Sequence, residues 1–380
     1  MTVLGITGGG QAGAAAGALA LLSLVGSDAF QRIASVESTL LLFQAFASFG
    51  IATELSRSAA QSRAPKYIEA VRSCCWTAAV LCAVVSVVGL TLGAIPLSVS
   101  IGIGLLPMAM IGPEAILYGR GNVLAAALSS AARALLPIAA ALLFSFWRSD
   151  EASLLTAFSA GAIFAGAFSA LIGRHYGLRA IPHFSISALR IYGRLFHVGL
   201  GAAAQNLLRT FPLWLAVATV EPSAASYFYI YFKVVAVCYG GLRSVSQVFF
   251  PRFSDAAFAA RANGLLMLAV LASAVGVIAA GTYFSLGDGE IISAMIAMVA
   301  MLPAAATVGY QVQIILTRRD RVFGVVNVLA LLAAISAVLL TSVLKVSVFY
   351  ALLALAVIEA ALAAAYRHFS LRSLIKYEQS

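Results

Sequence analysis

Residues 322–343 read VFGVVNVLALLAAISAVLLTSV, and residues 346–366 read VSVFYALLALAVIEAALAAAY. The first run contains no charged residue, and the second contains one, Glu359. A helix of about 20 apolar residues crosses about 30 Å of hydrocarbon, so each run is long enough to span a bilayer once. The pair therefore predicts two consecutive membrane-spanning helices.

The composition of the whole chain agrees with this pair of runs. Of the 380 residues, 62% are hydrophobic and 10% are charged, whereas an ordinary soluble domain has about 45–50% apolar and about 25% charged residues. The mean hydropathy of +1.00 is typical of membrane proteins. These values exclude a soluble enzyme, a nucleic-acid-binding domain and a disordered chain, and they predict an all-α polytopic membrane protein.

Apolar runs of spanning length recur along the entire sequence and predict twelve transmembrane helices. Their ranges are 3–25, 33–54, 74–95, 100–118, 122–147, 152–173, 196–219, 224–247, 264–285, 291–316, 322–343 and 346–366. The connections between them are too short for a soluble catalytic domain. Nearly all of the chain is therefore expected to lie within the membrane.

Basic residues alternate between the connections, and this alternation predicts the orientation of the chain. One set of connections contains eighteen Lys and Arg residues: Arg57, Arg63, Lys66, Arg72, Arg120, Arg174, Arg179, Arg190, Arg194, Arg243, Arg252, Arg261, Arg318, Arg319, Arg321, Arg367, Arg372 and Lys376. The other set contains Arg32, Arg148 and Lys345. Cytoplasmic loops are enriched in Lys and Arg, so both termini are expected in the cytoplasm of a bacterial inner-membrane protein. The net charge of +10 reflects this topology and does not indicate a nucleic-acid partner.

The twelve predicted spans divide into two lobes of six helices each. The amino-terminal lobe covers residues 1–178, a cytoplasmic linker covers 179–195, and the carboxy-terminal lobe with a short cytoplasmic tail covers 196–380. This is the layout of transporters built from an internal repeat. The linker is either an amphipathic helix on the membrane surface or an irregular basic loop.

Five ionisable side chains of the predicted spans cannot be placed at a membrane surface, and each costs on the order of 2.5–3.5 kcal/mol unless it has a partner or a wet cavity. They are Glu114, Arg133, Arg209, Lys233 and Glu359. At about 1.5 Å per residue, Arg209 and Lys233 lie roughly 15 and 14 Å below the outer ends of consecutive spans. This common depth predicts a cationic substrate cavity, to which Gln205 and Asn206, one turn before Arg209, add polar groups.

The remaining intramembrane charges allow two interpretations each. Glu114 and Arg133 have matching depths on neighbouring spans, so they either neutralise each other in a salt bridge or leave Arg133 to contact substrate. Glu359 either balances Arg209 or Lys233, or accepts a proton in a coupling step. The residues alone do not choose between these roles.

Sequence signatures of enzymes and cofactor sites are missing from the chain. No GxxxxGK[ST] phosphate-binding loop, HExxH motif or GxSxG motif occurs, and the histidines and cysteines lack the spacing of metal ligands. We therefore expect no catalytic residues, no metal and no cofactor. The protein is not expected to be an enzyme.

Three stretches carry a resemblance to a known family. They are FGIATELSRSAAQ at 49–61, YGRGN at 118–122 and SYFYIYFKVVAVCYGGLRSVSQVFFPRFSDA at 226–256. Together with twelve spans in two halves, they resemble the Wzx-type polysaccharide (O-antigen/exopolysaccharide) flippases of the multidrug/oligosaccharidyl-lipid/polysaccharide exporter superfamily. The resemblance implies a MATE-like, two-lobed helical bundle. It also implies that cations in the seventh and eighth spans hold the substrate, which matches Arg209 and Lys233, with Arg133 a weaker match.

This resemblance implies a function and a set of partners. The family moves undecaprenyl-diphosphate-linked oligosaccharide from the inner to the outer leaflet by alternating access, for polysaccharide biosynthesis and export. The implied partners are the lipid-linked oligosaccharide, the lipid bilayer and polysaccharide polymerase or export proteins, with no nucleic acid. The alternatives are a multidrug cation antiporter of the same superfamily, a membrane-embedded transferase, and a scaffold of an export assembly that transports nothing.

Overall fold

All secondary structure that the computed structural model describes is helical, and no strand occurs among the described residues. Those residues are 50–91, 113–148, 150–179, 188–283 and 287–378, with 6, 10, 13, 14 and 17. The predicted spans 3–25, 33–54 and 100–118 lie wholly or largely outside them. The predicted all-α fold is confirmed.

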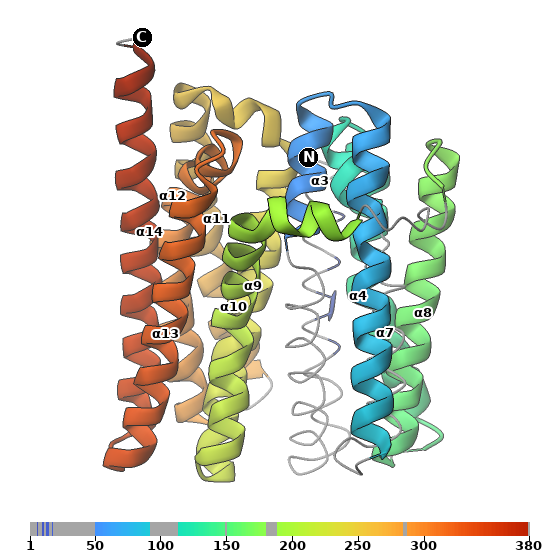
Figure 1. The fold of residues 1–380 in the computed structure, drawn as a ribbon. Helices are drawn as coiled ribbons and strands as arrows, with labels where there is room; N and C mark the ends of the chain where they lie inside the picture. Colours follow the sequence, from blue (N-terminus) through green and yellow to red (C-terminus); the bar gives the residue numbers. More distant parts are fainter. Residues whose placement is uncertain are drawn as a thin grey trace. The chain divides into compact units, whose positions relative to one another are not determined.

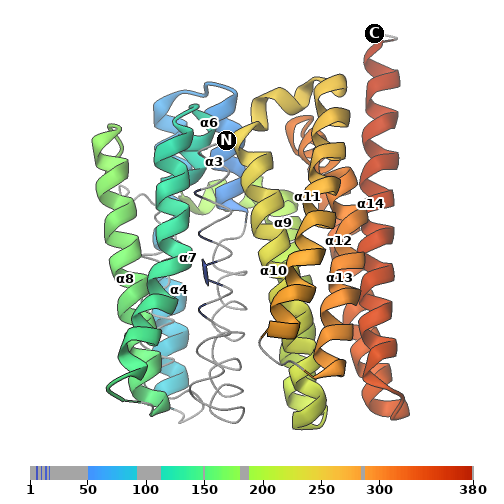
Figure 2. The same cartoon turned by 180° about the vertical axis from the view of Figure 1, so that it is seen from behind.

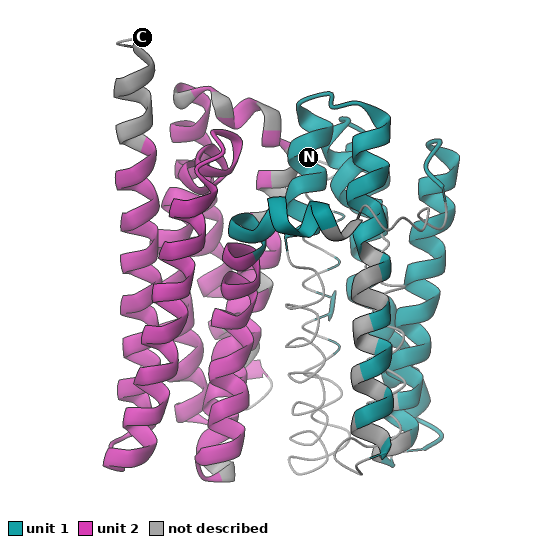
Figure 3. Cartoon of the chain, viewed as in Figure 1, with its two compact units in different colours: residues 1–199 teal, residues 200–380 magenta. Residues whose placement is uncertain are grey.

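The chain forms two compact units, residues 1–199 and 200–380 (Figure 3). The helices of the first unit are α3 (Ile51–Ala60), α4 (Pro65–Thr91), α6 (Glu114–Gly119), α7 (Val123–Ser145) and α8 (Glu151–His175). Helix α9 (Ala188–Thr219) begins in the first unit and continues into the second. The second unit also contains α10 (Pro222–Val248), the 3-10 helix η1 (Phe250–Ser254), α11 (Ala256–Tyr283), α12 (Asp288–Leu316), α13 (Asp320–Leu344) and α14 (Val348–Glu378).

Seven of the described helices contain an apolar stretch long enough to cross a membrane. These stretches are Val123–Ser145, Thr156–His175, Ala224–Leu242, Ala257–Gly276, Asp288–Leu316, Asp320–Leu344 and Val348–Ser370. Each overlaps a predicted span, with the largest offset between Ala257–Gly276 and the prediction 264–285, so the protein is a multi-pass membrane protein. Helices α7 and α13 begin and end within two residues of their predicted spans, 122–147 and 322–343.

Several helices extend beyond the spans that hydropathy predicts. Helix α4 begins at Pro65 rather than residue 74, α9 at Ala188 rather than 196, and α11 at Ala256 rather than 264. The additional turns of α4 and α9 contain several charged residues, and a helix needs no apolar side chains where its surface meets water. The additional turns of α11 are mostly alanine and belong to its apolar stretch. Residues 188–195 of the predicted linker are the first turns of α9 and are continuous with the residues of the seventh predicted span.

In the first unit, α7 and α8 lie side by side along their lengths (Figures 1 and 2). The two backbones approach closely at Gly161 on α8. A Cβ atom built there would lie 2.5 Å from the carbonyl oxygen of Leu136 and 2.7 Å from the Cα atom of Pro137. Both atoms belong to the backbone of α7, so only glycine fits at this contact. Small residues allow membrane helices to pack this closely.

In the second unit, α12 is the central helix and packs on α10, α11, α13 and α14. These helices run alongside one another in both views (Figures 1 and 2). The buried face of α12 is made largely of small side chains. They include Ser293, Ala294, Ala297, Ala300, Ala304 and Ala305. Small side chains let neighbouring backbones approach on several sides at once. This explains how α12 packs against four other helices.

Helix α8 begins with a side-chain cap that gives the protein a local pH dependence. The Asp150 carboxylate accepts a hydrogen bond of 3.1 Å from the backbone N–H of Ser153. The side-chain hydrogen bond with Ser153 lowers the pKa of the Asp150 carboxyl below its ordinary value. The cap therefore contributes stability above the ordinary Asp pKa, and this contribution is lost as pH falls through the lowered value.

We expect amide hydrogen exchange in the first turn of α8, at Ser153, to accelerate when the pH falls through that range, after correction for intrinsic exchange rates. The D150N variant is the control, because asparagine also caps helices but does not titrate there. Its first turn should exchange with no additional pH dependence. The same acid-induced acceleration in D150N would show that the cap is not its cause.

Candidate functional site

Three helices of the second unit bring together an arginine, a tyrosine and a glutamate. The Cζ atom of Arg209 on α9 lies 3.2 Å from the centroid of the Tyr239 ring on α10. The Tyr239 hydroxyl donates a hydrogen bond of 2.9 Å to Oε2 of Glu359 on α14. Glu359 is 5% exposed. We call these three residues the RYE cluster.

Tyr239 contacts both charged residues of the RYE cluster, Arg209 with its ring and Glu359 with its hydroxyl group. Its ring faces the guanidinium, which attracts a cation to the negative face of the π-system. Its hydroxyl satisfies the carboxylate, because a buried charge must be paired or hydrogen-bonded. Of the roles predicted for Glu359, charge balance with Arg209 has this structural basis. The coupling role stays a prediction.

The guanidinium of Arg209 has unused hydrogen-bonding capacity. Its Nε and Nη2 atoms are buried, and neither has a hydrogen-bond partner among the residues that the structure describes. Arginine has five N–H donors in a rigid fork that matches carboxylates, phosphates and similar anions. Buried donors without partners are rare, because each costs free energy. Arg209 is therefore the described side chain best prepared to receive an anionic group.

Lys233, Gln205 and Asn206 lie on the same two helices as the first two members of the RYE cluster. The Nζ atom of Lys233 is 5.2 Å from the ring centroid of Tyr229, one turn earlier on α10. Gln205 and Asn206 are partly buried on α9, and the backbone carbonyl of Asn206 accepts a 3.2 Å hydrogen bond from Thr210. Arg209 and Lys233 each face a different tyrosine. That these groups line one cavity stays a prediction.

In the first unit, Glu114 and Arg133 form the ion pair that was one of their two predicted roles. Arg133 Nε on α7 is 3.1 Å from Glu114 Oε1 on α6. The same carboxylate oxygen accepts a 2.5 Å hydrogen bond from Ser129 Oγ, which is 2.6 Å from Ser169 Oγ on α8. About a third of the Arg133 side chain remains exposed. Glu114 is thus satisfied within the unit, and contact of Arg133 with substrate stays a prediction.

Two arginines that the sequence suggests as loop residues are buried instead. Arg57 on α3 is 4% exposed and forms a salt bridge with Glu54, and Arg72 on α4 is 3% exposed and forms one with Glu69. Glu54 also accepts 2.9 Å hydrogen bonds from the Ser58 and Tyr67 hydroxyls. Acidic and basic residues three positions apart on a helix are neighbours. That spacing was the signal that could have identified both pairs in the sequence.

A second buried polar contact joins α13 and α14. The Tyr366 hydroxyl donates a 2.8 Å hydrogen bond to Oδ1 of Asn327, and Nδ2 of Asn327 donates one of 2.7 Å to the carbonyl of Phe323. Asn327 is fully buried and Tyr366 is 4% exposed. Sequence reasoning missed both residues, because a single asparagine or tyrosine in an apolar run gives no sign of its partner.

The Y366F variant tests this contact. It removes the hydroxyl and leaves the buried Asn327 oxygen without its donor, which costs about 1–3 kcal/mol. We expect a lower thermal unfolding temperature of the purified protein and no other change in its helix content. A Y350F variant is the control, because Tyr350 on the same helix is 66% exposed. Equal unfolding temperatures for the two variants would contradict the contact.

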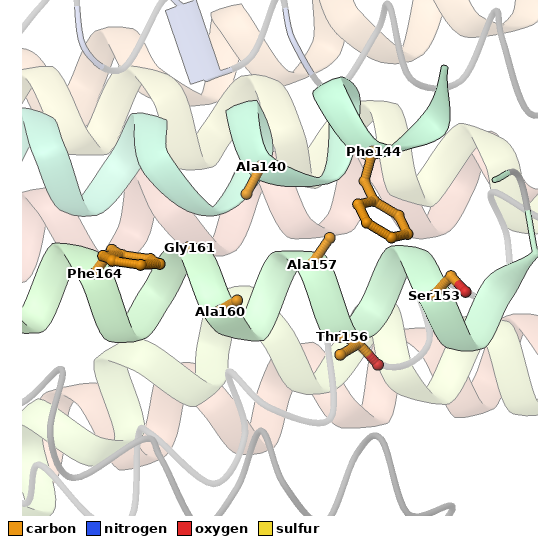
Figure 4. A pocket seen from close by; sticks show the side chains of 8 residues that line it. All are labelled: Ala140, Phe144, Ser153, Thr156, Ala157, Ala160, Gly161 and Phe164. Atoms are coloured by element: carbon orange, nitrogen blue, oxygen red, sulfur yellow. The ribbon is translucent and has the colours of Figure 1, made fainter. Parts of the chain in front are cut away.

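A cavity of about 450 Å³ lies between α7 and α8 of the first unit, where Figure 4 shows the side chains around it. Its lining residues are Ala140, Phe144, Ser153, Thr156, Ala157, Ala160, Gly161 and Phe164. None of them titrates in the ordinary pH range, and none is among the predicted site residues. The cavity is suited to apolar groups and offers no basis for charge recognition.

The described residues contain no cluster of metal-ligating side chains. Among residues 50–91, 113–148, 150–179, 188–283 and 287–378, no three His, Cys, Asp or Glu side chains lie together in a way that could hold an ion. Among the described residues, Cys74 and Cys238 are not joined in disulfides.

The protein resembles known proteins in its fold but not in its sequence. No protein-family model matches the chain, and no curated protein matches it. Solved structures do match over the whole chain.

An outward-facing multidrug resistance MATE family transporter of the MOP superfamily has a TM-score of 0.70 at 11% identity, covering 100% of this chain and 96% of the other. The MATE multidrug transporter DinF-BH has a TM-score of 0.68 at 14% identity, covering 96% and 93%. A eukaryotic MATE transporter, AtDTX14, has a TM-score of 0.63 at 15% identity, covering 97% and 95%. The chain thus has the fold of MATE transporters.

Proposed function

We propose that this protein is a secondary transporter that moves an organic substrate through the bilayer by alternating access. The observation that carries the proposal is the likeness to MATE transporters over the full length of the chain. The RYE cluster, in which Glu359 is buried, supports it, because ionisable residues inside membrane spans are costly and usually serve substrate or ion binding. An inner-membrane location with both termini in the cytoplasm belongs to the same proposal.

The first candidate for the substrate is a drug-like organic molecule that the protein exports. The solved structures favour this candidate, since they include multidrug transporters. The acidic residues near these cations favour it too, because Glu114 forms an ion pair with Arg133 and Glu359 lies in one cluster with Arg209. A strongly cationic cavity, on which the flippase expectation depended, has less support than the sequence suggested.

The second candidate is a lipid-linked oligosaccharide that the protein flips between leaflets. One observation favours it: the two buried Arg209 donors without partners among the described residues suit a diphosphate or an acidic sugar. An inside-negative potential would assist outward movement of an anion by about 2.3 kcal/mol per charge per 100 mV. The resemblance of residues 226–256 to the flippase family points in the same direction.

A deletion strain tests the proposal and separates the two candidates. Under export of organic molecules, loss of the protein lowers tolerance to a panel of amphipathic compounds and slows their efflux. Under flipping, lipid-linked oligosaccharide accumulates on the cytoplasmic leaflet and surface polysaccharide falls. The intact gene should restore the lost property. A gene carrying R209Q and E359Q together should not, although this variant keeps the net charge of the cluster unchanged.

The control is a K345Q variant, since Lys345 is exposed at the end of α13 and should tolerate the change. It should complement the deletion fully. If neither efflux nor the leaflet distribution of lipid-linked intermediates changes on deletion, the proposed transport function is wrong.

A further inference from the structure

We propose that the RYE cluster is a linked binding site for one proton and one anionic group of the substrate. The inference rests on the proposed transport function and names the chemistry of its cargo. Protonation of Glu359 and binding of an anion at Arg209 should each strengthen the other. The proton binds at the Glu359 carboxylate, and the anion binds at the Nε–Nη2 edge of the Arg209 guanidinium.

The net charge of the RYE cluster depends on whether Glu359 is protonated. With Glu359 ionised, Arg209 and Glu359 sum to zero, and Tyr239 contacts both of them. With Glu359 protonated, the cluster carries one positive charge in a membrane interior. An uncompensated charge there is costly, and arginine cannot release its proton to remove it. An anion bound at Arg209 restores neutrality, so the protonated cluster favours anion binding.

The hydrogen-bond inventory supports the same conclusion. Glu359 Oε2 accepts from Tyr239, whereas Nε and Nη2 of Arg209 are buried and donate to none of the described residues. Two adjacent guanidinium donors fit a carboxylate, phosphate or sulfonate in a bidentate manner. An organic cation at this position would meet the guanidinium at close range and be repelled by it.

The surroundings contain few other groups that could take the proton. Glu359 interacts electrostatically with Arg209 on α9, with Tyr231 and Tyr239 on α10, and with Tyr366 on its own helix. Of the two other helices packed on α14, α12 contains Tyr310 as its single titratable residue between 291 and 316, and α13 contains none between 322 and 344. The carboxyl group of Glu359 is therefore the proton acceptor of this region.

The experiment uses the full-length protein in lipid nanodiscs and a matched pair of probes. Naphthalene-2-sulfonate stays ionised throughout the pH range, so any proton taken up on binding must go to the protein. A naphthylmethyl-trimethylammonium ion has the same ring and the opposite charge. Calorimetry in buffers of different ionisation enthalpy measures both the affinity and the number of protons taken up.

We expect the sulfonate to bind more tightly as the pH falls, by up to about tenfold per pH unit where Glu359 titrates, with proton uptake approaching about one per bound probe. The E359Q variant should bind the sulfonate at every pH with the affinity that the wild type reaches at low pH, and without proton uptake. The R209Q variant should not bind it. The Y239F variant keeps the ring but loses the hydroxyl, so its linkage should persist with the titration displaced in pH.

Three results would overturn the inference: sulfonate affinity that is independent of pH, proton uptake that persists in E359Q, or preferential binding of the ammonium probe. If E359Q does not fold, the loss of sulfonate binding in R209Q and the displaced titration in Y239F still test the linked site. Transport is measured separately in the deletion strain. Linked binding of proton and sulfonate with no effect of deletion would refute the proposed transport function but not the linked binding site. Transport without linked binding would refute the linked binding site but not the transport function.

Discussion

The E359Q variant should unfold more readily than the R209Q variant, although each removes one of the two charges of the RYE cluster. E359Q leaves the partly buried Arg209 charge without its countercharge, and a guanidinium stays charged at every accessible pH. Removing one partner of a fully buried ion pair typically costs about 3–5 kcal/mol, which is the upper bound for this cluster. R209Q leaves Glu359 uncompensated, but a carboxylate can take up a proton and become neutral. The two losses are therefore unequal.

The double variant R209Q/E359Q supplies the control for this prediction. It removes both charges, and the amide introduced by E359Q can still accept a hydrogen bond from Tyr239, so most of the stability should return. Thermal unfolding of all four proteins in one detergent gives the coupling between the two positions. Naphthalene-2-sulfonate should also raise the unfolding temperature of E359Q more than that of the wild type. Additive losses in the double variant would contradict the pairing of the two charges.

The G161A variant is expected to lose stability although it adds one methyl group to a helix. The new Cβ would lie 2.5 Å from the Leu136 carbonyl oxygen and 2.7 Å from the Pro137 Cα atom. Both are backbone atoms that cannot rotate away, so α7 and α8 must move apart. Overpacking of this kind typically costs about 1–3 kcal/mol. Thermal unfolding of the purified protein measures the loss.

The matched control is G276A on α11, where a Cβ atom would meet nothing within 4 Å. Alanine favours the helix over glycine by about 0.8–1.0 kcal/mol, so G276A should unfold at the same temperature as the wild type or above it. The same substitution is thus expected to change stability in opposite directions at the two positions. An unfolding temperature of G161A equal to that of G276A would show that α7 and α8 do not pack at Gly161.

Hydropathy predicted the spanning helices of the described residues because long apolar runs have few alternatives in a bilayer. Helix α13 follows its predicted span within two residues at the amino end and one at the carboxyl end. Helices α4 and α9 begin earlier than predicted. Their first turns contain charged residues, and a criterion based on hydropathy includes only the apolar part of a helix. The Arg57 and Arg72 side chains show the same limit, since charge alone does not tell a loop residue from a buried, paired one.

The sequence identified Arg209 and Glu359 as costly intramembrane charges, but it did not identify their connection. That connection depends on Tyr239, which stands in the run VAVCYGG and has the pattern of an ordinary apolar helix. Whether its ring faces Arg209 is decided by the rotation of α10 about its axis, and the sequence does not specify this rotation. Glu114 and Arg133, by contrast, were expected at one depth and are paired.

Distance measurement between the two units tests the proposed alternating access most directly. Spin labels would be placed in a cysteine-free background at Arg148 of the first unit and Lys345 of the second, both exposed just beyond the ends of α7 and α13. We expect two distance populations in nanodiscs, with a ratio that changes when naphthalene-2-sulfonate is added at low pH. A single population that neither pH nor the probe changes would contradict alternating access.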